Sequence, residues 1–278
     1  MNLPQFTGGH TILTVSEEKG ASLNRLLAEF PPGAVLPTRW LTAHGYADNL
    51  LPKYVAAGWL ASAGRGVYVR TGAEPTWAGA VYALQLLLGL PLHVGGLSAL
   101  DARGFTHFLR FGSKPVRLYG PSRLPKWAAG VVPQHPLQWH SDRLFNFPEN
   151  ASVAECALVE FRPDVERYTL RFAGEERAFL EFLDEAPKRA SVYEADAILS
   201  LLTRLRPGRL QTLLAHCTSY KVKRLFLALA HRHRHPWLAH LDLAAIDLGR
   251  GKRSLVPGGK FDTRFQITLP ADLDAEFR

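Results

Sequence analysis

Apolar residues near the N-terminus recur with the period of an amphipathic helix. The apolar residues at i, i+3, i+4 and i+7 are Leu23, Leu26, Leu27 and Phe30. The run Pro31-Pro32-Gly33 follows directly, and this combination ends a helix. The pattern therefore predicts a first helix over residues 22–30.

Two further helices are predicted in the next thirty residues, over 38–43 and 48–58. Asp48 suits the N-cap of the later one, and Pro52 falls in its first turn, where no backbone donor is lost. Its expected buried stripe is Leu51, Tyr54 and Val55. The stretch 77–92 is strongly apolar but shorter than a bilayer span of about 20 residues, so it predicts a buried helix.

A small hairpin is predicted after the third helix. Residues 59–61 and 67–69 resemble strands, and Gly64 and Gly66 supply the permissive backbone of the turn between them. Three helices followed by such a hairpin are typical of a winged helix-turn-helix, which binds DNA with its third helix and its hairpin. The residues that we expect to contact DNA are Thr38, Arg39, Asn49, Lys53, Arg65 and Arg70.

More helices are predicted beyond residue 190. Ser191 and Glu194 form a capping box, in which each side chain bonds a free amide at the start of a helix. Pro207 suits the first turn of the following helix. A basic amphipathic helix is predicted over 219–235, with the apolar stripe Val222, Leu225, Phe226 and Leu229.

Two other segments have clear patterns. Apolar and polar residues alternate over 261–269, which predicts one strand. The glutamate-rich segment 175–185 is expected to be a helix that exposes its acids opposite Phe179, Leu180 and Leu183. The expected fold class is α+β, predominantly helical.

The charge of the chain favours a polyanionic partner. The net charge is +8 and the pI is about 9.7. Residues 203–264 hold 13 Lys and Arg against 3 Asp and Glu, whereas residues 149–187 hold 10 acids against 4 arginines. The basic surface expected to carry function in the C-terminal half is Lys221, Lys223, Arg224, Arg250, Lys252, Arg253 and Lys260.

Enzymatic and metal-dependent functions are not expected. His231, His233 and His235 have a spacing that puts only the first and last on one helical face, and Cys156 and Cys217 lack neighbouring thiols. Gly259-Lys260 lacks the first glycine and the Ser or Thr of a Walker loop, and no Gly-x-Ser-x-Gly motif is present. We expect no cofactor, no metal, no membrane partner and, without an export signal, a cytoplasmic location.

Three segments carry a resemblance to a known family. Residues 26–72, which include GWL and GRGVYVR, resemble the N-terminal winged-helix domain of the AbiEi antitoxins of bacterial abortive-infection toxin-antitoxin systems. Gly95 to Gly120 is similar to the segment that follows, and Ser219 to Pro270 resembles the C-terminal antitoxin domain. The resemblance implies a winged-helix domain over 1–96 and a helical antitoxin domain with a small sheet over 97–278.

The resemblance also implies partners. A member of this family is expected to bind operator DNA with an inverted repeat, to repress its own operon, and to counteract an AbiEii-like nucleotidyltransferase toxin without necessarily touching it. Three alternative functions stay open. The first is a module that neutralises the toxin by docking, and the second is an enzyme that reverses a modification made by the toxin. The third is an RNA-binding protein that uses Tyr220 or Trp237 beside its basic residues.

Overall fold

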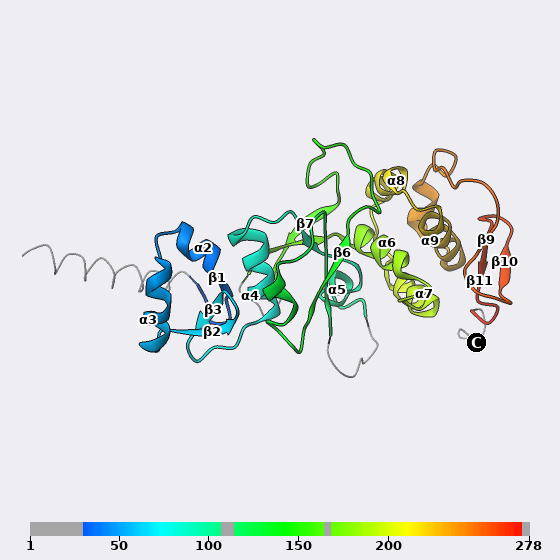
Figure 1. The fold of residues 1–278 in the computed structure, drawn as a ribbon. Coiled ribbons are helices and arrows are strands. Elements are labelled where there is room, and N and C mark those ends of the chain that lie inside the picture. The colour runs from blue at the N-terminus through cyan, green and yellow to red at the C-terminus, as the bar shows by residue number, and fades with distance from the viewer. Residues whose placement is uncertain (1–29, 107–113, 164–167, 274–278) are drawn as a thin grey trace, which may run out of the picture.

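The computed structural model describes residues 30–106, 114–163 and 168–273. Helices and strands alternate through these ranges, and the strands form three separate sheets along an elongated molecule (Figure 1). The predicted α+β class is confirmed. The expected predominance of helix is not clear-cut, because a five-stranded sheet that the sequence pattern did not predict occupies the middle of the chain.

The N-terminal unit consists of two short helical segments and a hairpin that a third strand joins. In chain order it contains β1 (Leu36–Pro37), α2 (Thr38–Ala43), the 3₁₀ helix η1 (Asp48–Leu50), α3 (Leu51–Ala56), β2 (Leu60–Gly64) and β3 (Val67–Arg70). Strand β3 lies between β1 and β2 and is antiparallel to both. The second helix, the third helix and the hairpin are confirmed. The predicted first helix lies outside the described residues except for Phe30, which is buried.

The apolar face of α3 is narrower than expected. Leu51 is fully buried and Tyr54 is half-buried, but the side chain of Val55 is 36% exposed. The chain leaves the helix at Ala57 and turns at Gly58, whose φ is +72°. The last turn of α3 therefore leaves part of the Val55 side chain exposed to solvent.

The middle of the chain forms a mixed sheet with strand order β6-β5-β4-β8-β7. Its strands are β4 (His93–Val94), β5 (Val116–Gly120), β6 (Leu137–Ser141), β7 (Leu158–Phe161) and β8 (Leu170–Ala173). The helical segments beside it are α4 (Trp77–Tyr82), the π-helical turn η2 (Ala83–Leu87), α5 (Gly96–Asp101) and the 3₁₀ helix η3 (Lys126–Ala129). The apolar stretch 77–92 thus supplies α4 and η2, which are mostly buried although Leu86 is exposed.

The C-terminal part is built from four α-helices, one short 3₁₀ helix and a small sheet. The α-helices are α6 (Glu175–Glu185), α7 (Val192–Leu201), α8 (Pro207–His216) and α9 (Tyr220–His233), and the 3₁₀ helix is η4 (Pro236–His240). The side chain of Ser191 accepts a hydrogen bond from the amide of Tyr193 and so caps α7, as predicted. Pro207 is the first residue of α8, and the predicted amphipathic helix is α9.

The prediction of a single strand over 261–269 is wrong. The segment forms two antiparallel strands, β10 (Lys260–Asp262) and β11 (Ile267–Leu269), and β9 (Arg253–Ser254) pairs with β11 in parallel. The Asp262 carboxylate accepts a hydrogen bond from the amide of Phe265 at 2.8 Å, and Gln266 has a φ of +54°. These two features reverse the chain where the alternating pattern predicted an extended backbone.

Helix α6 is the central helix rather than an exposed acidic one. It packs against α5, α8 and α9, with the rings of Phe179 and Phe226 edge to face at 6.2 Å. The prediction that its acids are exposed is wrong for Glu176, Glu181 and Glu185, which are buried. The reason is that each of these carboxylates finds a buried hydrogen-bond donor on another element or in its own helix.

Candidate nucleic-acid interface and basic C-terminal surface

The start of α2 and the tip of the hairpin are joined directly. The backbone amide of Thr38 donates a hydrogen bond to the carbonyl oxygen of Gly66 at 2.9 Å. Gly66 has a φ of +76°, in the left-handed region that glycine adopts without strain. The exposed side chain of Arg65 therefore lies beside the first turn of α2. Two elements that contact the DNA backbone in winged helices are placed next to each other here.

The residues expected to contact DNA all reach the surface. Thr38 is half-buried and the five exposed residues are Arg39, Asn49, Lys53, Arg65 and Arg70. Arg65 and Arg70 lie at opposite ends of β3. The amide of Thr71 donates to the carbonyl of Trp59 at 3.2 Å, which places the Arg70 end beside the connection from α3 to β2. The four cations are thus carried by α2, α3 and the hairpin of the N-terminal unit.

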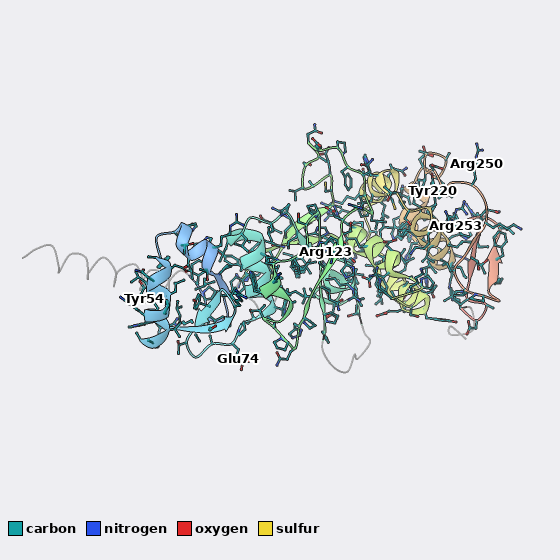
Figure 2. The ribbon with its side chains drawn as sticks, in the orientation of Figure 1. Tyr54, Glu74, Arg123, Tyr220, Arg250 and Arg253 are labelled. Carbon is teal, nitrogen blue, oxygen red and sulfur yellow. The ribbon has the colours of Figure 1, made fainter. Side chains whose placement is uncertain are left out.

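Two exposed apolar side chains of the same unit were missed as candidates. Trp59 is 45% exposed and Val55 is 36% exposed. The amide of Trp59 donates to the carbonyl of Tyr54 at 2.9 Å, so the indole directly follows the end of α3. Figure 2 labels Tyr54 at this end of the molecule. The one signal for Trp59 in the sequence is an aromatic residue at the first position of a short predicted strand, and that signal indicates only a strand.

In the C-terminal half, the expected exposure of Lys223 and Arg224 is wrong. Arg224 is 2% exposed, and its guanidinium donates to four carbonyl oxygens in the segment after α9. Lys223 is 4% exposed, with its Nζ 5.1 Å from the ring centroid of Tyr220. This face of α9 packs against the segment that follows the helix, and backbone carbonyl oxygens of that segment replace water as hydrogen-bond acceptors.

The side chain of Lys221 is also hydrogen-bonded, but it lines a cleft. Its Nζ donates to the carbonyl oxygens of Asp184 at 2.6 Å and Ala186 at 2.7 Å, and burial lowers the pKa of Lys221. The cleft has a volume of about 440 Å³ and is also lined by Arg253 from β9. Its other basic lining residues, not singled out from the sequence, are Lys188 and Arg189. The structure thus brings two predicted residues together from different elements.

The remaining predicted cations lie on the surface of the C-terminal segment. The exposed residues are Arg250, Lys252, Arg253 and Lys260. Figure 2 shows Arg250, Arg253 and Tyr220 at one end of the molecule, far from Tyr54. Tyr220 is 37% exposed, its hydroxyl bonds to the Asp247 carboxylate at 3.2 Å, and Trp237 is buried. The basic surface is therefore formed by the segment 250–260 and the cleft, to which α9 contributes Lys221.

A buried polar cluster joins α6 to the middle sheet. Glu181 lies 2.8 Å from His93 Nε2 and 2.8 Å from Arg177 Nε, and it accepts a hydrogen bond from the amide of Gly96 at 2.9 Å. Burial by itself raises the pKa of the Glu181 carboxyl, but the interactions with His93 and Arg177 outweigh it and lower the pKa to about 2. The carboxylate is therefore ionised and fixed, which suits a structural role.

The same cluster continues one turn along α6. Arg117 Nε donates to Glu185 Oε1 at 2.9 Å, and the hydroxyl of Tyr119 donates to the same oxygen at 3.2 Å. Burial raises the pKa of Tyr119 well above its usual value, so its hydroxyl remains protonated. Helix α6 is thereby tied to β5 by charged hydrogen bonds as well as by apolar packing.

Metal and membrane sites receive no support from the part of the chain that is described. Within those ranges no three His, Cys, Asp or Glu side chains gather to hold a metal ion. His233 bonds to Asp196 at 2.7 Å, and His235 donates to the carbonyl of Leu199 at 2.8 Å. No described helix is long and apolar enough to cross a bilayer.

Two family models define the class of protein, the transcriptional regulators that act as antitoxins. One family model, described as "Transcriptional regulator, AbiEi antitoxin N-terminal domain", matches residues 19–111. A second, described as "Transcriptional regulator, AbiEi antitoxin, Type IV TA system", matches residues 113–270. The chain belongs to the AbiEi family of type IV toxin-antitoxin systems, as the three sequence segments indicated. These descriptions name a regulator and an antitoxin, and no catalytic activity.

The solved structures add a likeness in fold. The chain is similar to a structure titled "Crystal structure of RV2827C protein from Mycobacterium tuberculosis", with a TM-score of 0.61 and 15% sequence identity. The alignment covers 93% of this chain and 94% of that one. At this identity the likeness concerns the fold alone. A search of the curated proteins found no match.

Proposed function

We propose that the chain represses its own operon by binding operator DNA through an N-terminal winged helix-turn-helix. In this proposal α3 enters the major groove and the hairpin contacts the DNA backbone. The observation that carries the proposal is the bond between Thr38 and Gly66, because it sets Arg65 beside Thr38 and Arg39 at the start of α2. Exposed Ala56 and Ala57 leave α3 free to approach base edges.

The same proposal assigns the antitoxin role to the C-terminal domain, residues 97–278. The basic segment 250–260 and the cleft at Lys221 and Arg253 are the surface through which it counteracts an AbiEii-like nucleotidyltransferase toxin. An inverted-repeat operator fits two copies of the chain related by a two-fold axis. The proposal does not require that antitoxin and toxin form a complex.

Two alternatives have less support. RNA stacking requires an open aromatic face beside cations, but Trp237 is buried, and Lys223 and Gly249 lie against the ring of Tyr220. Docking through an apolar surface requires a contiguous patch, whereas the exposed apolar residues of the C-terminal helices, Leu201 and Tyr220, stand singly on different helices.

The test is a gel-shift titration of the full chain against its upstream DNA and a scrambled duplex at several salt concentrations. The variant is Lys53→Ala with Arg65→Ala, and the matched control is Lys126→Ala with Arg143→Ala, which removes the same charge from exposed positions outside the N-terminal unit. We expect preference for the upstream DNA, lost in the variant and kept in the control. Equal, steeply salt-dependent binding to both duplexes would contradict operator recognition.

A further inference from the structure

A large cleft lies between the middle sheet and the C-terminal helices, away from every residue assigned above. Its volume is about 750 Å³. Its walls come from the end of α5, strand β7, the start of α6, and the loop between α7 and α8. The charged residues that line it are Arg103, Arg204, Arg206, Arg209, Glu175 and Glu176. Its volume falls in the range of small-molecule sites, about 300–1,000 Å³.

One arginine of the cleft is fixed in place. Arg103 Nη1 donates to the carbonyl oxygen of Ala99 at 2.8 Å. Its guanidinium carbon lies 4.7 Å from the ring centroid of Phe161 and 5.6 Å from that of Phe172. Burial lowers the pKa of Arg103, although an arginine stays charged at any physiological pH. A held, partly desolvated guanidinium interacts more strongly with an anion than a mobile surface one.

Three further arginines of the cleft have guanidinium groups that form no ion pair within the described ranges. These residues are Arg204, Arg206 and Arg209. The backbone amide of Arg206 donates to Glu176 Oε1 at 2.9 Å, which anchors their loop against α6. Arg209 Nη1 lies 3.7 Å from the point that a Cβ on Gly174 would occupy, so it points to the first turn of α6.

The electrostatic balance of the cleft favours an anion. Four guanidinium groups face two carboxylates, and one of these, Glu176, is buried and held by the Arg206 amide. Helix α6 has eleven residues, begins after Gly174, and has no side-chain cap at its N-terminus. Its unsatisfied amides and the positive end of its dipole add to the charge of Arg209 at the same place.

We propose that this cleft binds a free nucleotide through its phosphate groups. Arg204, Arg206 and Arg209 supply the planar donors that phosphate oxygens accept, next to the start of α6. The apolar lining residues Phe105, Val159 and Leu201 provide a surface for a base, which inorganic phosphate does not need. The chain thereby gains a small-molecule site in its C-terminal domain, separate from the DNA surface.

The test is isothermal titration calorimetry of the full chain with ATP, GTP and inorganic phosphate. The variant is Arg204→Ala with Arg209→Ala, which keeps the Arg206 amide bond to Glu176, and the control is Lys126→Ala with Arg143→Ala. We expect a nucleotide Kd in the micromolar range, at least about tenfold weaker in the variant and unchanged in the control. Thermal unfolding of the variant should match that of the parent chain.

A gain-of-binding variant tests the electrostatic argument in the other direction. Glu175→Gln removes one of the two negative charges of the cleft and should tighten nucleotide binding several-fold. Failure of both nucleotides to bind, equal loss in variant and control, or weaker binding by Glu175→Gln would overturn the proposal. Inorganic phosphate binding as tightly as the nucleotides would also overturn it, because the cleft would then be an unspecific anion site.

Discussion

Arg224 in the middle of α9 donates from Nη2 to the carbonyl oxygen of Gly249 at 3.0 Å. The same guanidinium reaches the carbonyls of Leu248 and Gly251 and, beyond the turn, that of Gln266. One buried side chain therefore fixes the path of the segment that presents Arg250 to solvent. The sequence pattern indicated an exposed basic helix face at this position, but Arg224 is buried. Its contribution is to the stability of the fold.

We expect Arg224→Met to destabilise the chain by about 3 kcal/mol, because four carbonyl oxygens lose their donor and are left buried. The measurement is urea unfolding followed by circular dichroism. The matched control is Arg250→Met, in which an exposed side chain changes and the unfolding midpoint should barely move. A midpoint for Arg224→Met equal to that of the control would show that water satisfies these carbonyls.

The hairpin tip gives a second prediction. Gly66 has a φ of +76°, so Gly66→Ala forces a side chain into the left-handed region at a cost of about 1–2 kcal/mol. Because the carbonyl of Gly66 accepts from Thr38, we expect operator affinity to fall together with stability. Gly130→Ala is the control, since Gly130 has a φ of −123° and open space around its Cα. Full operator affinity in Gly66→Ala would mean that the tip does not position Arg65.

The buried cluster on α6 makes the stability of the chain sensitive to acid. The pKa of Glu181 is about 2 in the folded chain and about 4.3 in an unfolded one. A lowered folded pKa gives stability that is present above the unfolded value and is lost as the pH falls toward 2. Glu181 therefore stabilises the folded chain at neutral pH through its contacts with Arg177, His93 and Gly96, and this stabilisation is lost in acid.

Glu181→Gln tests this contribution. The amide oxygen still accepts from Gly96, but the charge is gone, so the free energy of unfolding should depend less steeply on pH between about 5 and 2. Urea titrations at several pH values measure the slope, and Glu160→Gln, at the exposed position of β7, is the control. An unchanged acid slope in Glu181→Gln would indicate that other carboxylates carry the acid dependence.

The sequence predicted the parts of the fold that local patterns determine. Helix α2, the hairpin and the Ser191 cap each follow from residues within a few positions of one another. The middle sheet was missed because its strands lack a clear alternation of apolar and polar residues: β4 contains only two residues, and all five residues of β5 are buried, including Arg117. Tertiary context decided the rest, since a buried glutamate-rich helix cannot be told from an exposed one until Arg117 and His93 are known to lie beside it.

The same contrast holds for the candidate surfaces. Charge in the sequence identified Lys221 and Arg253 without showing that they meet in one cleft. It also grouped Arg224 with Arg250, although the first is buried and the second exposed. The arginines of the larger cleft come from the turn after α5, the loop before α8, and α8 itself, and no sequence motif links them.

The two candidate surfaces lie far apart, so substitutions at one of them should leave the function of the other intact. The triple variant Arg250→Ala, Lys252→Ala, Arg253→Ala removes exposed cations at the end of the molecule opposite α3, so folding and operator binding should be preserved (Figure 2). We expect this variant to lose the ability to protect cells that express the cognate toxin, whereas Lys53→Ala with Arg65→Ala should keep protection and lose repression. Growth under toxin expression and a promoter reporter measure the two activities in parallel. Loss of both activities in either variant at normal protein levels would contradict two independent surfaces, because one shared surface would then serve DNA and toxin alike.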